Sequence, residues 1–304
     1  MKIVLIIPTK DRPIDIQNLF ASIVSQTRKP DLVIVIDGSD NPIKSIVDRF
    51  NDQVNLSYFP CRPPSLPKQR NLGIKNIPKD SDWVGFLDDD LVLEDDALEN
   101  LEKLIVQQNN PNLKGIGLSI INQPVTRSSF FNKLFLMASK APGEITKAGY
   151  PTIIPFVKQD TNTKWIYGGA TFWSADVFEK FTFDEWFFGT GYMEDVDFSY
   201  RVSRNYDLMI SSKAQCNHYH HGIPASKEAS IGEWQLTSWW YFVKKYNDFS
   251  RFAIFWAMFG LIIKNWIKIL LCRTSRDIQR SRGHLRGLIK IISGKALELK
   301  GFSK

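Results

Sequence analysis

The sequence predicts an α/β fold, in which a Rossmann-like, mostly parallel sheet is flanked by helices and followed by a C-terminal amphipathic helical extension. Short apolar runs alternate with segments of helical periodicity in the first part of the chain, and polar clusters follow three of the apolar runs. Such alternation is typical of parallel sheets with right-handed crossovers. The 304 residues, 43% of them hydrophobic, are enough to bury the core of one large or two small domains.

The expected elements follow in chain order. Apolar runs predict strands at residues 3–7, 32–36, 54–59 and 83–87, and helical stripes predict helices at 14–24, 43–50, 68–77 and 96–107. The second half is less regular. There we expect a strand at 165–173 interrupted by Gly168 and Gly169, a helix at 194–205, strands at 208–211 and 215–219, and a Trp-rich helix at 233–246.

Three polar clusters come directly after predicted strands. They are Thr9-Lys10-Asp11-Arg12, Asp37-Gly38-Ser39-Asp40 and Asp88-Asp89-Asp90. The carboxyl ends of parallel strands share one edge of a sheet, and ligands of such sheets bind beyond that edge. The three clusters therefore predict one binding site.

The acidic triplet suggests what that site holds. Three adjacent carboxylates repel one another, and a bound divalent cation is a physical reason to keep them together. If the segment is strand-like, Asp88 and Asp90 point to one side and face the ligand, whereas Asp89 points to the other and is structural. The alternative is a solvated acidic turn, which the neighbouring Glu94 and Asp95 would suit.

Six segments, in this order, resemble the motifs of glycosyltransferase family 2, whose fold is called GT-A. The resemblance covers roughly residues 1–245, and Gln69 stands where the family usually has Ala. The segments are Ile6-Ile7-Pro8-Thr9-Lys10-Asp11-Arg12, Val33-Ile34-Val35-Ile36-Asp37-Gly38-Ser39, Lys68-Gln69-Arg70-Asn71-Leu72-Gly73, Phe86-Leu87-Asp88-Asp89-Asp90, Gly168-Gly169-Ala170-Thr171-Phe172 and Tyr192-Met193-Glu194-Asp195-Val196-Asp197-Phe198.

This resemblance implies a nucleotide-diphosphate sugar as donor and Mn²⁺ or Mg²⁺ as cofactor. By similarity, Asp90 binds the metal, Asp88 touches ribose or metal, and Asp37 and Arg70 hold the nucleobase. Thr9 lines the base pocket through its backbone. The remaining donor-binding residues that the resemblance implies are Pro8, Asp11, Arg12, Asp89, Gly168, Gly169 and Glu194.

The catalytic base implied by the resemblance is Asp195, the second residue of the Glu-Asp motif. Glu194 and Asp195 open a predicted helix, where the positive end of the helix dipole favours ionised carboxylates. An ionised carboxylate is what a base near an acceptor hydroxyl requires. The alternative is the ordinary preference of acidic residues for helix N-termini.

Three histidines, His218, His220 and His221, lie close together in the sequence. Ala214-Gln215-Cys216-Asn217-His218 resembles the family's strand that ends in a metal-binding His, so His218 is the expected third metal ligand beside Asp90 and Asp88. We expect His220 and His221 to lie in a solvated loop. The aromatic and glycine-containing loop at 186–191 either covers the donor or plugs the core.

The predicted function is inverting transfer of one sugar to an acceptor hydroxyl, in surface polysaccharide or glycolipid synthesis. We divide the chain into a nucleotide-sugar-binding half at 1–125, an acceptor and catalytic half at 126–247, and a basic tail at 248–304. Two alternatives remain. A nucleotidyltransferase would usually carry a Gly-rich loop after the first strand, which residues 8–13 lack, and a non-catalytic carbohydrate-binding protein need not retain Asp195.

The charge of the chain is concentrated at its C-terminus. The net charge is +7, but residues 264–304 hold eleven Lys/Arg against two acidic residues, which leaves the rest near −2. The apolar run before them, 252–263, is shorter than the about 20 residues of a membrane span, and Trp266 and Lys268 follow it. This pattern favours a helix lying on the cytoplasmic membrane surface over nucleic-acid binding. The alternative is a core helix with a solvated basic end.

The three cysteines, Cys61, Cys216 and Cys272, are far apart and odd in number, which suits a reducing compartment. The apolar run at 3–7 is too short for a signal peptide. We therefore expect a cytoplasmic protein, peripheral to the inner face of the cell membrane, with a saccharide or lipid-linked saccharide as acceptor.

Overall fold

The computed structural model describes residues 1–124, 129–220, 222, 224–272 and 274–298. By compactness the chain divides into two units. Unit 1 comprises residues 1–125 and 154–220, and unit 2 comprises residues 126–153 and 221–304. The boundaries expected from the sequence, after residues 125 and 247, stay predictions of functional organisation. His221 lies outside the described residues.

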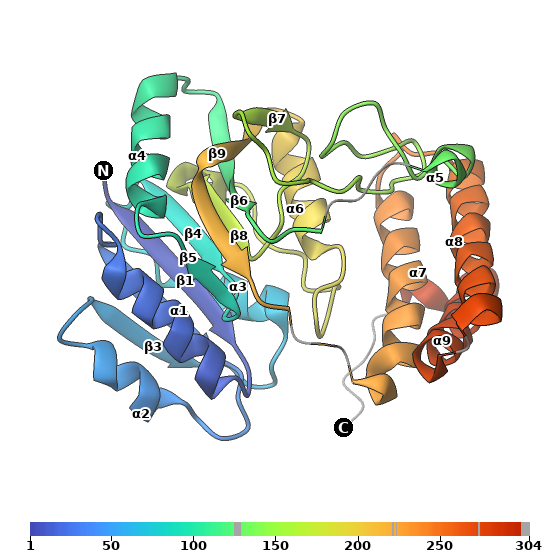
Figure 1. Ribbon diagram of the computed structural model, residues 1–304, viewed down its shortest axis with the longest axis horizontal. Coiled ribbons are helices and arrows are strands. Elements are labelled where there is room, and N and C mark those ends of the chain that lie inside the picture. Colours follow the sequence, from blue (N-terminus) through green and yellow to red (C-terminus); the bar gives the residue numbers. More distant parts are fainter. Residues whose placement is uncertain (125–128, 221, 223, 273, 299–304) are drawn as a thin grey trace. The chain divides into compact units, whose positions relative to one another are not determined.

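Unit 1 is built on one mixed sheet that joins nine strands of the described chain (Figure 1). The strand order is β3-β2-β1-β4-β8-β6-β9-β5, and β7 pairs with β9. The strands are β1 (Ile3–Thr9), β2 (Leu32–Asp37), β3 (Leu56–Pro60), β4 (Trp83–Leu87), β5 (Leu91–Leu93), β6 (Leu113–Ile120), β7 (Thr161–Thr163), β8 (Ala170–Ser174) and β9 (Asp207–His218).

The N-terminal half of this sheet is parallel, as the sequence predicts. β1 pairs in parallel with both β2 and β4, and β2 pairs in parallel with β3. β8 then enters between β4 and β6 in the antiparallel sense, which brings the Gly168-Gly169 segment to the carboxyl end of β4. β6 and β9 pair in parallel beyond it. The α/β class and the GT-A-like arrangement are therefore confirmed, with four antiparallel pairings that the alternation did not predict.

Helices cover both faces of the sheet. α1 (Pro13–Ser25) and α4 (Ala97–Gln108) pack their apolar faces, including Phe20 and Leu101, into the main hydrophobic core. α3 (Leu66–Lys75) packs against the opposite face, where Gly73 lets the helix approach the side chain of Ile6. α6 (Glu194–Ser203) contributes Phe198, whose ring stacks on Phe183. The remaining elements of unit 1 are short: α2 (Lys44–Val47), η1 (Asp48–Phe50) and η2 (Ala175–Glu179).

Some boundaries differ from the prediction. The strand expected at 165–173 begins only at Ala170, because residues 167–169 turn before it. The two strands expected at 208–211 and 215–219 form the single strand β9, whose pairing with β6 shifts register between Gly117 and Ser119. A bulge of this kind breaks the alternation of side chains, so one bent strand reads as two.

Unit 2 is helical. Its elements are α5 (Phe130–Leu134), η3 (Ala225–Lys227), α7 (Glu228–Lys245), α8 (Arg251–Cys272), α9 (Ser275–Ile292) and η4 (Lys295–Leu297). A Cβ atom at Gly283 of α9 would collide with the backbone of Ala229 in α7, and one at Gly287 would lie tightly against Glu233 and Leu236, so the two helices pack closely. Ion pairs from Arg280 to Glu228 and from Lys290 to Glu233 join the same two helices.

Candidate active site

The loops after β1 and β2 are tied together at the carboxyl edge of the sheet. Thr9 is paired with Asp37 across the two strands, and the Gly38 amide donates to the Thr9 carbonyl at 2.8 Å. The Asp11 amide donates to Ser39 Oγ, and the Asp40 amide donates to Asp11 Oδ1, both at 2.8 Å. These bonds hold the two predicted donor loops as one rim, which begins at the buried Pro8.

Asp37, which the resemblance assigns to the nucleobase, is fully buried in this structure. Its carboxylate accepts from the amides of Ser39 at 2.7 Å and Ile43 at 3.0 Å, and from the Tyr58 hydroxyl. Burial acts to raise the pKa of Asp37, but these hydrogen bonds outweigh it and hold the pKa below its ordinary value. In this arrangement the Asp37 carboxylate fixes the shape of the loop after β2.

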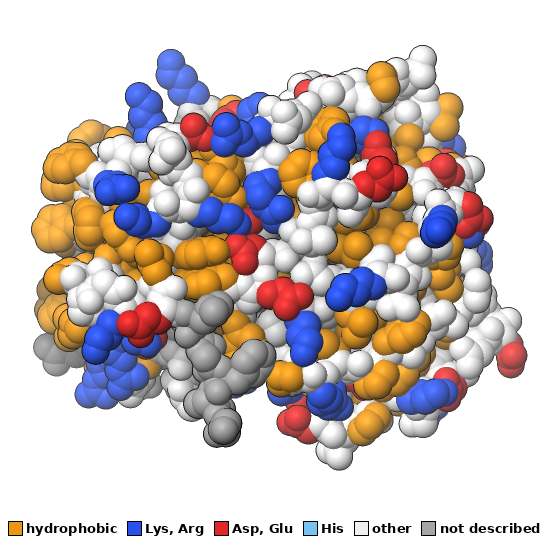
Figure 2. Space-filling model, turned by 180° about the vertical axis from the view of Figure 1, so that it is seen from behind, with side chains coloured by type: hydrophobic (Ala, Val, Ile, Leu, Met, Phe, Trp, Pro, Cys, Tyr) orange, Lys and Arg blue, Asp and Glu red, His pale blue; other side chains and the backbone are white. Residues whose placement is uncertain are grey.

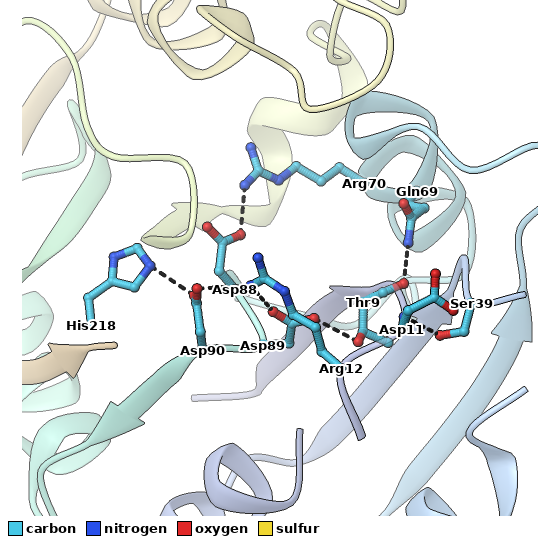
Figure 3. Close-up of polar contacts among 10 residues, drawn as sticks. All are labelled: Thr9, Asp11, Arg12, Ser39, Gln69, Arg70, Asp88, Asp89, Asp90 and His218. Atoms are coloured by element: carbon cyan, nitrogen blue, oxygen red, sulfur yellow. Dashed lines mark hydrogen bonds and ion pairs between the residues drawn. The ribbon is translucent and has the colours of Figure 1, made fainter. Parts of the chain in front are cut away.

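Gln69 and Tyr58 are two site-shaping residues that sequence reasoning did not assign. The Gln69 amide group donates to the carbonyl oxygens of Thr9 at 2.9 Å and Ile36 at 2.8 Å. It therefore joins α3 to the ends of β1 and β2 (Figure 3). The replacement of the family's usual Ala by Gln69 is the one sequence signal that pointed to it.

The acidic triplet lies in the turn between β4 and β5, and its carboxylates have different partners (Figure 3). Asp89 accepts from Thr9 Oγ1 at 2.7 Å and from Arg12 at 2.8 Å. The same Arg12 nitrogen contacts Asp90 at 2.8 Å, whereas Asp88 forms an ion pair with Arg70 at 3.2 Å. The expectation that Asp88 and Asp90 face the ligand together stays a prediction; in this structure Asp89 and Asp90 share Arg12 as a partner.

The environments of Asp89 and Asp90 shift the pKa values of these two carboxyl groups in opposite directions. Burial raises the pKa of Asp89 to about 6, although Arg12 and Thr9 oppose it. For Asp90, burial acts upward but is outweighed by the hydrogen bond and charge of His218 and by Arg12, so its pKa is lowered. Asp90 is thus the member of the buried pair that its surroundings keep ionised, as a metal ligand must be.

Asp90, His218 and His220 form a group that could hold a cation. Their ligand atoms all lie within 4.8 Å of one another. His218 Nε2 lies 2.8 Å from Asp90 Oδ1, and the rings of His218 and His220 are 3.6 Å apart between centroids. His220 is exposed, as expected of a loop residue, yet it belongs to this group. Imidazole nitrogens suit divalent transition ions, whereas Mg²⁺ prefers oxygen ligands.

A second cluster centres on Arg70, whose side chain is 1% exposed. Its guanidinium pairs with Glu194 and Asp88 and lies over the rings of Phe86 and Phe183. Arg70 Nε and Glu194 Oε2 have no hydrogen-bond partner among the described residues. The guanidinium therefore faces carboxylates, and the nucleobase role that the resemblance assigns to Arg70 stays a prediction.

Asp195 lies beside this cluster in the first turn of α6. Its Oδ2 accepts from the Gly168 amide at 3.1 Å and its Oδ1 from the Val196 amide at 2.8 Å. A Cβ at Gly168 would collide with Arg70 and Asp195, and one at Gly169 with the Asp88 carboxylate. Both glycines are thus required by close approach, and they bring the first turn of α6 next to the acidic turn.

The loop at 183–192 was expected either to cover the donor or to plug the core, and it has features of both. Trp186 and Phe187 are buried, which favours the plug. Gly189 and Gly191 have positive φ, and the Gly189 carbonyl accepts from the Leu66 amide at 2.9 Å. The Asn71 side chain of α3 donates to the Phe183 carbonyl and accepts from the Phe183 amide, both at 2.9 Å. The start of the loop is therefore anchored to α3.

A known protein family resembles this chain in sequence, and solved structures resemble it in fold. Residues 4–128 match the family model described as "Glycosyl transferase family 2". Over these residues the chain is similar to glycosyltransferase family 2, and it is a glycosyltransferase. No curated protein matches it in sequence. The match covers the segments with the Thr9, Asp37, Arg70 and Asp88 motifs, and it favours sugar transfer over the nucleotidyltransferase and binding-protein alternatives.

Solved structures resemble the chain over almost its whole length. TarS 1–349 from S. aureus has 16% identity and a TM-score of 0.56, with 98% of this chain and 88% of that chain covered. The mannosyltransferase PcManGT from Pyrobaculum calidifontis, in complex with GDP-Man and Mn²⁺, has 13% identity and a TM-score of 0.58, with 97% and 88% covered. TarS 1–349 is also known in complex with UDP-GlcNAc, at 14% identity and a TM-score of 0.53, with 97% and 93% covered. These similarities establish the GT-A fold.

Proposed function

We propose that this glycosyltransferase moves one sugar, with inversion, from a nucleotide-diphosphate sugar to an acceptor hydroxyl. The observation that carries the proposal is the placement of Asp195. Its half-buried carboxylate is fixed by two backbone amides next to Gly168, while Asp88 and Asp90 lie at the neighbouring end of β4. A base on one side and a cation-binding group on the other are what displacement of a nucleoside diphosphate needs.

The residues of the chain divide the work. Asp195 accepts the proton of the acceptor hydroxyl as that hydroxyl attacks the anomeric carbon. Asp90 and His218, with His220 beside them, would hold Mn²⁺ or Mg²⁺, and a bound cation would offset the charge of the departing diphosphate. Arg12 supplies a cationic side chain at the same edge. Asp11 and Lys10 are exposed on the rim, where they can meet the donor.

The donor class is supported by the complexes of the similar structures, which hold UDP-GlcNAc and GDP-Man. For the acceptor we propose a saccharide or a lipid-linked saccharide of surface polysaccharide or glycolipid synthesis. The basis is the apolar and basic C-terminal region, which favours work at the inner face of the cell membrane.

The test is incubation of the protein with UDP-, GDP- and dTDP-sugars, with Mn²⁺ or Mg²⁺ and a panel of lipid-linked saccharides. Sugar transfer predicts free nucleoside diphosphate and a product of inverted anomeric configuration by NMR. Release of pyrophosphate instead would contradict the proposal, and a retained configuration would exclude direct displacement by a hydroxyl that Asp195 activates.

A further inference from the structure

One face of α8 carries a row of exposed apolar side chains along the whole helix. Phe252, Phe255, Phe259, Trp266 and Leu270 follow one another at spacings of three, four, seven and four residues, which places them on one side. Their exposed fractions run from 40% at Phe255 to 78% at Phe252. Contiguous apolar surface of this kind on a folded protein marks an interaction site.

The other face of α8 is already used by the fold of unit 2. Ala253, Ile254, Ala257 and Met258 are buried, and Gly260 leaves room for the ring of Phe135. The Trp256 indole also donates to the Leu134 carbonyl at 2.8 Å. The helix therefore cannot turn its exposed row inward without losing these contacts.

α8 is long enough, at 22 residues, and apolar enough to cross a membrane. Its C-terminal half, however, is bonded to a polar helix. Asn265 donates to the Asp277 carbonyl at 3.0 Å, and Lys268 forms an ion pair with the Asp277 carboxylate at 2.8 Å. If α8 spanned the bilayer, it would draw the charged start of α9 into hydrocarbon, which is costly. These contacts favour a helix lying in the plane of the membrane surface.

α9 adds charge to this surface. Arg280 and Lys290 form ion pairs with α7, but Arg276, Arg282 and Arg286 are exposed and have no ion pair among the described residues. Leu285, Ile289 and Ile292 form an exposed apolar row on the same helix. Apolar rows on the same two helices as exposed, unpaired cations are complementary to a bilayer whose surface carries anionic phospholipids.

We propose that the exposed faces of α8 and α9 dock on an anionic phospholipid bilayer, with α8 lying in the plane of the interface. Figure 2 shows hydrophobic side chains gathered over these C-terminal helices, with Lys and Arg side chains beside them. The aromatic row of α8 enters the headgroup region, and the three arginines of α9 contact lipid phosphates. This inference deepens the membrane location proposed above and names the surface that makes the contact.

The experiment is co-sedimentation of the full-length protein, without donor, with vesicles of phosphatidylcholine alone or with added phosphatidylglycerol. Strong binding is expected only to the anionic vesicles, and salt should weaken it. The variant Arg276→Gln/Arg282→Gln/Arg286→Gln should need on the order of a hundredfold more anionic lipid for half-binding. Its matched control is Lys29→Gln/Lys75→Gln/Lys79→Gln, which removes three exposed cations from unit 1 and should bind normally.

A second variant tests the apolar row. Phe259→Ser/Trp266→Ser/Leu270→Ser should abolish vesicle binding, whereas Val106→Ser, at an exposed position of α4 in unit 1, should not change it. Equal binding to both vesicle types, or unchanged binding by either triple variant, overturns the proposal. So does self-association of the wild-type protein that the apolar variant removes, because a second copy would then cover the face.

The position of α8 can be measured separately. Cys272, at the end of α8, is exposed, whereas Cys61 and Cys216 are buried, so an impermeant maleimide reports on Cys272. With protein added outside sealed vesicles, an in-plane helix leaves Cys272 reactive, and complete protection would show that α8 crosses the bilayer. Release of nucleoside diphosphate in lipid-free solution is measured in parallel. Loss of vesicle binding with intact release refutes only the docking surface, and the reverse result refutes only the proposed transfer.

Discussion

Folded proteins usually bury apolar side chains and expose charged ones, and units 1 and 2 depart from this pattern in opposite ways. In unit 1 the unusual residues are charges placed inside, with Arg70, Glu194 and Asp90 almost fully buried. In unit 2 they are apolar groups placed outside, such as Phe252 and Leu271. A buried charge costs solvation free energy and an exposed apolar row leaves hydrophobic stabilisation unused, so neither is expected from folding alone. We attribute the first departure to the proposed active site and the second to the proposed membrane-docking surface.

The largest effect should come from the base in unit 1. Asp195→Asn keeps the shape of the side chain but removes its ability to accept a proton, so transfer should fall by about 10²–10⁴-fold. Donor affinity should stay nearly unchanged, because the substitution leaves the acidic turn intact. Release of nucleoside diphosphate and donor calorimetry measure the two quantities. Asp52→Asn, the same change at an exposed position, is the control, and turnover retained by Asp195→Asn would remove the residue from the mechanism.

Arg70 tests whether the buried charges of unit 1 depend on one another. Arg70→Met leaves Glu194 and Asp88 without their shared cation, and losing one partner of a buried ion pair costs about 3–5 kcal/mol. Urea unfolding should show this loss in the free energy of unfolding.

The double variant Arg70→Met/Glu194→Gln supplies the control, since it also removes the carboxylate that was left unpaired. It should be more stable than Arg70→Met alone. If the double variant is less stable by the sum of the two single effects, Arg70 and Glu194 contribute independently to the free energy of unfolding. The two residues would then not form a coupled cluster.

Much of unit 1 could be predicted because its signals are local. The apolar run before Asp88 identified β4, and the parallel sheet followed from the alternation, so the edge that holds Thr9, Asp37 and Asp88 was located. The partner of Arg70 could not be found this way. Glu194 lies 124 positions further along the chain, at the start of α6. The periodicity of a sequence indicates local helices and strands, and it does not indicate an ion pair between two distant helices.

Local signals report less where the backbone turns. Strand alternation does not reveal that, in the turn at residues 88–90, Arg12 pairs with both Asp89 and Asp90. In unit 2 the apolar run at 252–263 and the amphipathic continuation with Trp266 and Lys268 predicted a helix, and α8 extends to Cys272. The bonds of Asn265 and Lys268 to Asp277 of α9 could not be predicted, because they join two different helices.

Substitution of the two histidines near Asp90 tests which of them binds the cation. His218→Ala should weaken Mn²⁺ binding by about 10–100-fold, because His218 both offers a ligand nitrogen and orients Asp90. His220→Ala should have a smaller effect, since its ring is exposed and contacts His218 rather than Asp90. Titration calorimetry without donor measures both affinities. If the two variants are equally impaired, both imidazoles are ligands, and if neither is, the cluster does not bind the cation.

The pH dependence should report the burial of the base. Burial raises the pKa of Asp195 above its ordinary value, although Arg70 and the Gly168 amide oppose the shift. A base must be ionised to act, so transfer should fall as pH decreases through this raised pKa, at higher pH than for an exposed aspartate. Arg70→Lys keeps the opposing charge and should preserve this limb. A rate that stays constant down to the ordinary pKa of aspartate would contradict the assignment.

The smallest effect is expected in unit 2. Leu271 is 79% exposed, so its environment changes little on folding, and Leu271→Ser should alter the free energy of unfolding by less than about 0.5 kcal/mol. Leu98→Ala in the core of unit 1 is the matched comparison, and it should cost about 2–5 kcal/mol. Urea unfolding without lipid measures both. A loss above about 1 kcal/mol for Leu271→Ser would be too large for a surface substitution. It would mean that the C-terminal half of α8 is packed in solution, and the contrast between the two units would then rest on unit 1 alone.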